Sequence, residues 1–187
     1  MIETKRLLLR PWQESDRAPF AAMGQDEAVR RFLGPPQSRE ESDATVDRLI
    51  ALQSAYGYCF WALQHRTDGA FLGFCGLKPG PAGTPIADAI EIGWRLAVAY
   101  WRQGYAREAA VASLDWAWQN LEANTVYAMT VPANIASWGL MERLGMQRLA
   151  QLDFDHPDVP DGDPLKPHIV YGINRPANRP FVNQIPG

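Results

Sequence analysis

The stretch WRQGYAR, from Trp101 to Arg107, decides how this chain is interpreted, because it joins a strand-like run to a strongly periodic helical segment. Gly104 and the small Ala106 allow main-chain amides to approach a ligand closely. The helix that follows presents free N–H groups and the positive end of its dipole. A turn before a helix is often only a turn, but in this position the loop predicts an anion site suited to a pyrophosphate.

The chain lacks the motifs that would assign this loop to a nucleotide. Neither a GxxxxGK[ST] loop nor a GxGxxG fingerprint is present. Nucleoside triphosphates and dinucleotides are therefore disfavoured as ligands. A phosphate-bearing cofactor of another type is left.

The segments on either side of the loop predict a strand before it and a helix after it. Ile86 to Val98 is an apolar, strand-like run in which Gly93 marks a bulge or a close approach of the backbone. From Ala106 onward, small and apolar residues recur at helical spacing, which predicts an amphipathic helix that packs closely on a sheet. These residues are Ala109, Ala110, Ser113, Leu114, Ala117 and Leu121.

Turn and capping signals divide the rest of the chain into further elements. We predict strands at 6–11, 58–65, 70–78, 125–131, 146–154 and 168–174, and helices opened by Ser15-Asp16 and over 38–56 and 134–144. The clearest signals are the capping box from Ser38 to Glu41, the hairpin turn at 67–69 and the helix-ending Gly57 and Gly145. This order of elements predicts an α/β domain with a mixed sheet.

Length and composition favour one globular domain. The chain has 187 residues, of which 47% are hydrophobic and 21% charged, enough for one sizeable core and short for two. We expect a single domain over 1–174, followed by an extended C-terminal arm over 175–187. No run of eighteen apolar residues and no signal-peptide core appears, so the expected location is cytoplasmic.

Charge and cysteine content exclude several classes of partner. A net charge of -3 gives no general attraction to nucleic acid or to an anionic membrane. Cys59 and Cys75 lie in apolar strand-like runs without metal-ligand spacing, so we expect buried thiols and no metal site.

The loop and its surroundings resemble the GNAT acyltransferases. The signature of that superfamily is a strand, then Q/R-x-x-G-x-G/A, then a helix. Here Trp101 holds the first signature position, as is frequent in the branch similar to the ribosomal-protein N-terminal acetyltransferases, and Gly104 and Ala106 follow. The resemblance extends from Thr4 to Asn174 and includes the runs 5–10, 90–94 and 134–146.

This resemblance implies a fold, an activity and a cofactor site. The implied fold is a mixed, mostly antiparallel central sheet flanked by helices, with splayed central strands. The implied donor is acetyl-CoA, with its pyrophosphate in the loop and its pantetheine arm paired to the strand before it. The residues implied to contact the cofactor are Leu96, Ala97, Val98, Arg102, Gln103, Gly104, Tyr105, Ala106, Arg107 and Asn134.

The catalytic groups follow less directly. Many GNAT relatives carry a tyrosine as general acid seven positions after the asparagine, but here that position is Met141, which has no proton to donate. Ser137 is the best available donor by analogy, with water as the alternative. Glu91 is the carboxylate best placed to accept the proton of the amine, although a solvent-facing strand residue is an equal interpretation. Asn134 and Ser137 are also suited to capping a helix.

The acceptor is the least determined part. We expect an N-acetyltransferase acting on a primary amine, and favour a peptide or protein α-amine because its reference pKa, near 7.7–8.0, leaves a useful fraction uncharged. An amino sugar or polyamine, and a CoA-binding protein without catalysis, are the alternatives; a homodimer is left open. Five aspartates near the C-terminal strands suggest attraction of a cationic substrate, with His156 and His168 beside them. They are Asp153, Asp155, Asp158, Asp161 and Asp163.

Overall fold

The computed structural model describes residues 1–178, and within them nine strands form a single connected sheet. The strands are β1 (Ile2–Glu3), β2 (Leu7–Arg10), β3 (Phe60–His65), β4 (Phe71–Pro79), β5 (Ile90–Leu96), β6 (Thr125–Thr130), β7 (Gln147–Arg148), β8 (Phe154–Asp155) and β9 (Pro167–Asn174). Their order is β1-β2-β3-β4-β5-β6-β9-β7, with β8 beside β9. Every neighbouring pair is antiparallel except β5 and β6. The predicted mixed, mostly antiparallel sheet is confirmed.

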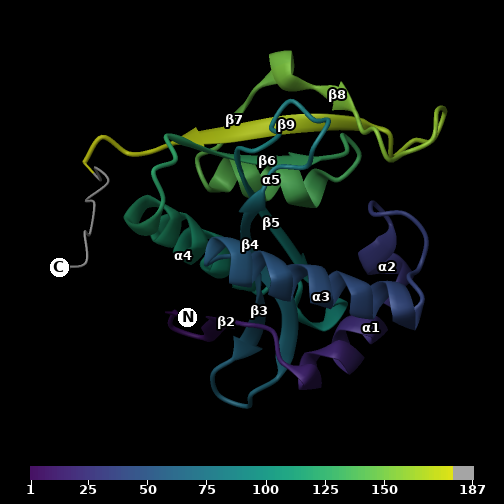
Figure 1. Cartoon of the computed structure of the whole chain (residues 1–187), viewed down its shortest axis with the longest axis vertical. Helices are drawn as coiled ribbons and strands as arrows, with labels where there is room; N and C mark the ends of the chain where they lie inside the picture. The colour runs from purple at the N-terminus through teal and green to yellow at the C-terminus, as the bar shows by residue number, and fades with distance from the viewer. Residues whose placement is uncertain (179–187) are drawn as a thin grey trace.

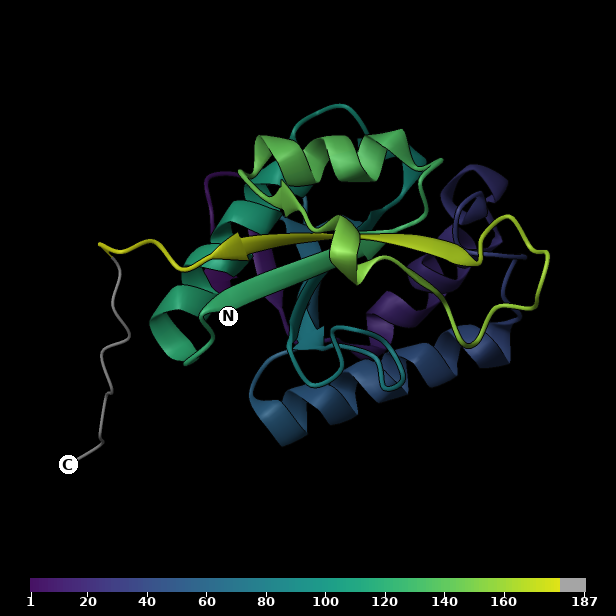
Figure 2. The same ribbon diagram turned by 90° about the horizontal axis from the view of Figure 1, so that it is seen from above.

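The helices lie on both faces of this sheet (Figure 1 and Figure 2). They are α1 (Arg17–Gln25), α2 (Glu27–Arg30), α3 (Arg39–Tyr56), α4 (Tyr105–Asn120) and α5 (Ile135–Arg143), with 3-10 turns at 14–16, 98–100 and 150–152. Helix α4 covers one face of β3 and β4, where Trp116 meets Trp61 at 5.1 Å between ring centroids. On the opposite face, Phe20 of α1 lies 6.2 Å from Phe74 of β4. The central strands are therefore buried on both faces.

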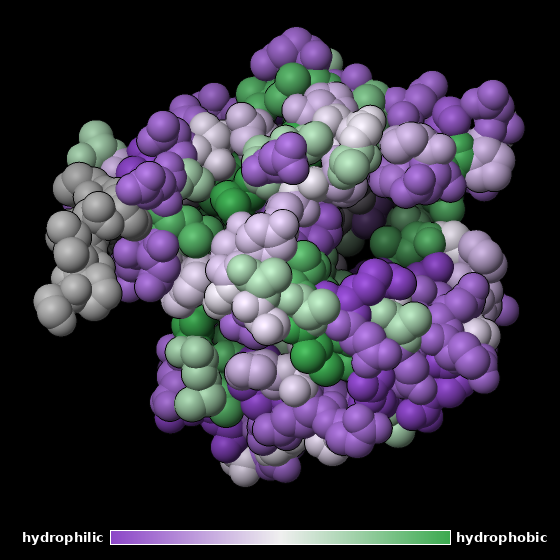
Figure 3. Space-filling view, viewed as in Figure 1, coloured by the Kyte–Doolittle hydropathy of each residue, from purple (hydrophilic) through white to green (hydrophobic). Residues whose placement is uncertain are grey.

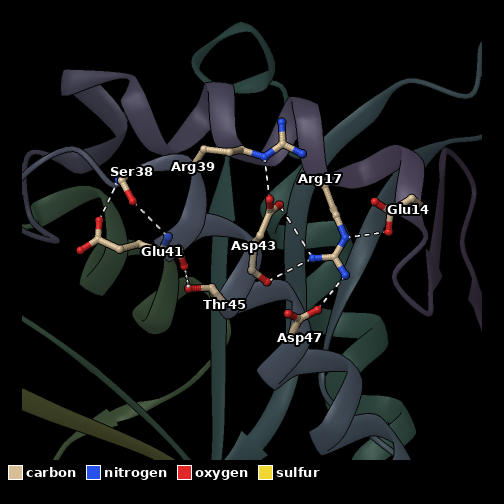
Figure 4. Close-up of polar contacts among 8 residues, drawn as sticks. All are labelled: Glu14, Arg17, Ser38, Arg39, Glu41, Asp43, Thr45 and Asp47. Carbon is tan, nitrogen blue, oxygen red and sulfur yellow. Dashed lines mark hydrogen bonds and ion pairs between the residues drawn. The ribbon is translucent and has the colours of Figure 1, made fainter.

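Helix α3 begins and ends as its capping signals predict, and polar contacts attach it to α1 (Figure 4). Ser38 and Glu41 form the reciprocal capping box, and Gly57 ends the helix with a φ of 78°. Arg17 of α1 donates to Asp47 at 2.7 Å and to the main-chain oxygen of Asp43 at 3.2 Å. These contacts hold α1 against α3.

The predicted strand over 146–154 is wrong in its middle. Only 147–148 and 154–155 are strands, with a 3-10 turn at 150–152 between them. Arg148 pairs with Tyr171 and Phe154 with His168, so five residues of this segment face two of β9. The excess residues have to leave the sheet. An ion pair between Arg148 and Asp153 closes the turn.

Two predictions of element starts differ in detail from the structure, and the predicted C-terminal arm lies largely outside the described residues. Asp16 stands at the N-cap position of α1, as predicted, but its buried carboxylate makes no capping bond there because it is bonded to Arg10 at 2.7 and 2.8 Å. The strand predicted from Ile86 begins only at Ile90, and its Gly93 pairs in regular register and marks no bulge. Instead a Cβ there would lie 2.7 Å from the ring of Phe60. The arm over 175–187 stays a prediction, since only residues 175–178 of it are described.

Candidate active site

The central feature of the site is a gap between β5 and β6. The two strands run parallel, but only Ile90 and Glu91 of β5 are paired, with Val126 and Tyr127. Beyond these positions β5 stays paired with β4 and β6 with β9. The sheet is thus splayed from Ile92 onward, as the resemblance implies.

Main-chain groups of β5 line this gap. In an antiparallel ladder, alternate residues direct their N–H and C=O groups toward the partner strand. The amide of Ala97 donates to Leu72 at 2.9 Å, so the groups of Trp94 and Leu96 are directed the other way, into the gap. The Leu96 carbonyl there accepts a hydrogen bond from the indole of Trp101 at 2.7 Å. The main-chain groups of Ala97 are both engaged within the protein, since its carbonyl accepts from Tyr100.

The loop from Trp101 to Arg107 ends in a row of main-chain amides without hydrogen-bond acceptors among residues 1–178. Arg102 and Gly104 have positive φ angles of 59° and 82°, and the first helical bond of α4 runs from Glu108 to Gly104. Within the described chain, the amides of residues 104–107 have no hydrogen-bond acceptor. Consecutive amides at a helix start form a concave donor surface with a positive dipole end. This surface fits an anion.

Arg6 braces this loop from the beginning of the chain. Its Nη1 donates to the carbonyl of Gln103 at 2.9 Å, and its Nε pairs with Glu108 at 2.7 Å. Its guanidinium also lies over the ring of Tyr105, 4.2 Å from the centroid. A depression of about 530 Å³ adjoins these contacts, with Arg107 among its lining residues. The loop is therefore held in place, with the Gln103 side chain donating to the Ala99 carbonyl at 2.7 Å, while the exposed Arg102 and Arg107 are placed to meet a ligand.

The second helix start belongs to α5. Asn134 caps it, accepting from the Ser137 amide at 3.3 Å and donating to the Thr130 hydroxyl at 3.1 Å. The capping interpretation of Asn134 is confirmed. Ser137 does not cap the helix; its main-chain amide is the donor that Asn134 accepts from. Met141 is buried, 1% exposed, so no proton donor occupies the position of the family tyrosine.

Topology brings the two helix starts to the same end of the gap. Because β5 and β6 are parallel, the helices that follow them both begin at the carboxyl ends of these strands. Figure 3 shows the surface hollowed beside β5, between the layer of β6, β9 and α5 and the helices α2 and α3. The arrangement can hold an elongated anionic ligand along β5 and a second molecule in the hollow.

Glu91 is buried and paired, not solvent-facing. It lies opposite Lys78 in the β4–β5 register and forms an ion pair with it. Burial raises the pKa of the Glu91 carboxyl, and the positive charge of Lys78 opposes that rise. Such a carboxylate can accept a proton, but Lys78 competes for it.

The aspartate loop is less acidic than its composition suggests. Asp153 is paired with Arg148, and Asp161 with Lys166 at 2.9 Å. The rings of His156 and His168 lie 5.0 Å apart, and burial lowers the pKa of His168. The loop therefore carries fewer unpaired negative charges than its five aspartates indicate.

The expectation of buried thiols is confirmed. Cys59 and Cys75 are both free and buried, and burial raises the pKa of each to about 12. Among residues 1–178, no group of three or more His, Cys, Asp or Glu side chains is arranged to hold a metal ion. No helix in that part of the chain is long and apolar enough to cross a membrane. The cytoplasmic location and a homodimer stay predictions.

Three charged residues of the site region were not singled out from the sequence. Arg6 had a visible position, at the start of the resembling run 5–10, but nothing indicated that it reaches the loop. Lys78 and Arg95 lie in apolar strands. Only the β4–β5 register shows that Lys78 is opposite Glu91 and that Arg95 is opposite Phe74. Strand register is the signal that single-sequence patterns lack.

Comparison with known proteins agrees with this geometry. The model of the acetyltransferase (GNAT) domain matches residues 6–147. The chain therefore belongs to the GNAT acetyltransferase family, and it is an acetyl-CoA-dependent N-acetyltransferase.

Individual relatives show how far the likeness extends. FsC-acetyl coenzyme A-N(2)-transacetylase of Aspergillus fumigatus is 26% identical over 93% of this chain and 76% of its own. An acetyltransferase structure from Agrobacterium tumefaciens is 26% identical with a TM-score of 0.75, covering 92% and 93% of the two chains.

Two further structures share the fold alone. RimL, a ribosomal L7/L12 α-N-protein acetyltransferase in complex with coenzyme A, is 16% identical, with a TM-score of 0.72 over 91% of this chain and 95% of its own. Spermidine N-acetyltransferase of Vibrio cholerae, in complex with CoA and spermine, is 15% identical, with a TM-score of 0.71 over 92% and 97%.

Proposed function

We propose that this enzyme transfers the acetyl group of acetyl-CoA to the α-amine of a peptide or protein, by direct attack while both substrates are bound. The observation that carries the proposal is the gap between β5 and β6, with the starts of α4 and α5 at its open end. Acetyl-CoA supplies an activated thioester, and holding the amine beside it makes the attack effectively unimolecular.

The unpartnered groups of the chain fit such a cosubstrate. The free amides of 104–107 bind the pyrophosphate, aided by the exposed Arg102 and Arg107, while Gln103 donates to the Ala99 carbonyl and contributes through its position in the loop. The main-chain groups of Trp94 pair with the pantetheine arm as an added strand would, and the amide of Leu96 is left for the acetyl group. Ala97 and Val98 contribute side-chain contact, because the main-chain groups of Ala97 are already bonded.

The reaction develops negative charge first on the acetyl oxygen and then on the departing sulfur. The Leu96 amide, directed into the gap, is the donor we assign to the acetyl oxygen. Ser137 is the proton donor we assign to the sulfur, with Asn134 holding its backbone in place. Glu91 accepts the proton of the amine through water, since its side chain is buried and one of its carboxylate oxygens is held by Lys78.

Two observations favour an α-amine over a more basic amine. Lys78 holds the Glu91 carboxylate in an ion pair and so competes for it, which suits an amine that is already partly uncharged at neutral pH. The internal ion pairs of the aspartate loop also reduce its attraction for polyamines.

The test is thiol release from acetyl-CoA with matched acceptors between pH 6 and 9. One peptide carries a free N-terminus and no lysine; its partner has a blocked N-terminus and one lysine. We expect the first to be acetylated faster, and Glu91→Gln to slow the lysine peptide more, because its proton is harder to remove. Preference for the lysine peptide, or activity confined to amino sugars or polyamines, would contradict the α-amine.

A further inference from the structure

Arg95, near the end of β5, is a largely buried cation without a hydrogen-bonding partner. Its Nε and Nη1 atoms are shielded from solvent and donate to no acceptor. Among residues 1–178 no carboxylate forms an ion pair with it, and its guanidinium lies over the Phe74 ring, 5.2 Å from the centroid. Burial, with a smaller contribution from the charge of Arg30, lowers the pKa of Arg95 to about 10. The side chain is therefore still charged at neutral pH.

Two buried arginines, Arg10 and Arg30, have their partners within the protein. Arg10 is paired with Asp16, and Arg30 donates to the carbonyls of Pro35 and Leu33 at 2.8 Å each. A buried charge without such partners is costly, and proteins rarely keep one that has no function. The contrast indicates that the partner of Arg95 is a ligand.

The position of Arg95 connects it to the acceptor. Side chains alternate along a strand, so Arg95 lies on the same face of β5 as Glu91, about 13 Å away. This face carries Phe74 and is opposite the one that α4 covers. Arg30 of α2 is the charged group that acts on Arg95 from the facing helices. Helix α2 borders the surface hollow in Figure 3.

We propose that Arg95 binds a carboxylate of the acceptor, so that the substrate is an amine that also bears a negative charge. This inference rests on the proposed function, because it assigns the hollow beside β5 to the amine. The planar guanidinium matches a carboxylate with two parallel hydrogen bonds. With Arg30 adding charge of the same sign, the site repels an acceptor that carries only positive charges.

Thiol release from acetyl-CoA tests this with acceptor pairs that differ in one charge. In one pair the second residue of a tripeptide amide is glutamate or glutamine; in the other, a dipeptide ends in a carboxylate or a carboxamide. We expect the acidic member of at least one pair to have a kcat/KM higher by roughly tenfold or more. Arg95→Gln brings that ratio close to one, and Arg95→Lys keeps part of it. The pair that responds tells a side-chain carboxylate from a terminal one.

A control variant and a measurement without catalysis complete the test. Arg143→Gln removes an exposed arginine at the far end of α5 and leaves the preference unchanged. Succinate, compared with chloride at equal ionic strength, raises the Tm of the parent but not of Arg95→Gln. The Tm without ligand shows that each variant is folded.

The outcomes separate the two proposals. If the acidic and neutral acceptors of every pair have equal kcat/KM and succinate does not change the Tm, the role of Arg95 is overturned. Acetyl transfer itself is then unaffected. A preference that survives in Arg95→Gln overturns it as well. A succinate effect lost in Arg95→Gln, without thiol release on any amine, supports the carboxylate site and overturns the proposed function.

Discussion

Glu91 and Ser137 depend for their chemistry on residues directly beside them. Lys78 faces Glu91 across two antiparallel strands, so the ion pair follows from the register of β4 and β5. Burial raises the pKa of Glu91 and Lys78 lowers it, and the balance decides how much carboxylate is present to accept a proton. Ser137 is half-buried, and its amide rather than its hydroxyl is engaged by Asn134.

Lys78→Met should shift the pH dependence of the reaction. Because Lys78 lowers the pKa of Glu91, its removal raises that pKa further, and less carboxylate exists at a given pH. The acid limb of kcat/KM should therefore move to higher pH. Lys5→Met, at an exposed lysine, is the control. If the acid limb stays in place in a folded Lys78→Met variant, the proton acceptor is not Glu91.

Ser137→Ala should lower kcat by roughly 10²-fold with little change in the KM for acetyl-CoA, as the loss of a proton donor does. Its stability should barely change, because the capping bond uses the Ser137 amide. Asn134→Ala removes that bond and should cost about 1 kcal/mol of unfolding free energy. Kinetics and thermal melting of both variants check this pattern. Full activity in Ser137→Ala would transfer the donor role to water.

The gap and the loop are properties of whole elements. A strand that loses its neighbour after two paired residues leaves main-chain groups free, which is costly unless a ligand or water pairs with them. The start of α4 adds amides that no helix can satisfy internally. The site is thus assembled mostly from backbone, and side chains such as Arg6 hold it in shape.

Gly104→Ala should weaken CoA binding by roughly tenfold or more, equivalent to about 1.4 kcal/mol. The new methyl group would stand among the free amides, with its Cβ 3.4 Å from the Arg6 guanidinium. Gly57→Ala is a matched control, because its φ of 78° is close to the 82° of Gly104 and no atom lies within 4 Å of a Cβ there. Both variants should lose a similar stability, about 1 kcal/mol.

Isothermal titration with CoA and thermal melting separate the two effects. Equal affinity of Gly104→Ala and Gly57→Ala for CoA would mean that the pyrophosphate binds elsewhere.

At the scale of the molecule, the β5–β6 pair is a short junction between two parts of the sheet. Strands β1 to β5 lie on one side of it, and β6, β9 and β7 on the other. The site residues come from both sides, with α4 following β5 and α5 following β6. A ligand that contacts both helix starts stabilises this junction.

Acetyl-CoA should therefore raise the melting temperature. A ligand that binds only the native state at a hundredfold excess over Kd adds about 2.7 kcal/mol, which for a domain of this size corresponds to roughly 5–10 °C. Desulfo-CoA should act alike, because the thiol is not part of the binding contacts proposed here. Thermal melting at several concentrations measures the effect. No shift with millimolar CoA compounds would contradict the cofactor site.

Much of the fold, including the helix start at Gly104, was predictable because its signals are local. The capping box at Ser38, the stop at Gly57 and the helix after Gly104 each depend on residues three or four positions apart. The strand predicted over 146–154 failed for the opposite reason. The segment has more residues between its two paired positions than β9 has opposite them. This mismatch depends on how the two strands pair, so no pattern within the segment itself indicates it.

The sequence by itself therefore determined most of the element order, the strand, loop and helix around Gly104 and the membership of the family, since these follow from short-range patterns and a contiguous motif. Only the tertiary structure decided that Glu91 is paired with Lys78, that Trp101 donates to the Leu96 carbonyl and that two guanidinium nitrogens of Arg95 are buried without a partner in the described chain. Each of these depends on strand register and on which helix covers which face. Burial and charge pairing arise between segments distant in the chain, so their energies are set only when the sheet and helices are assembled.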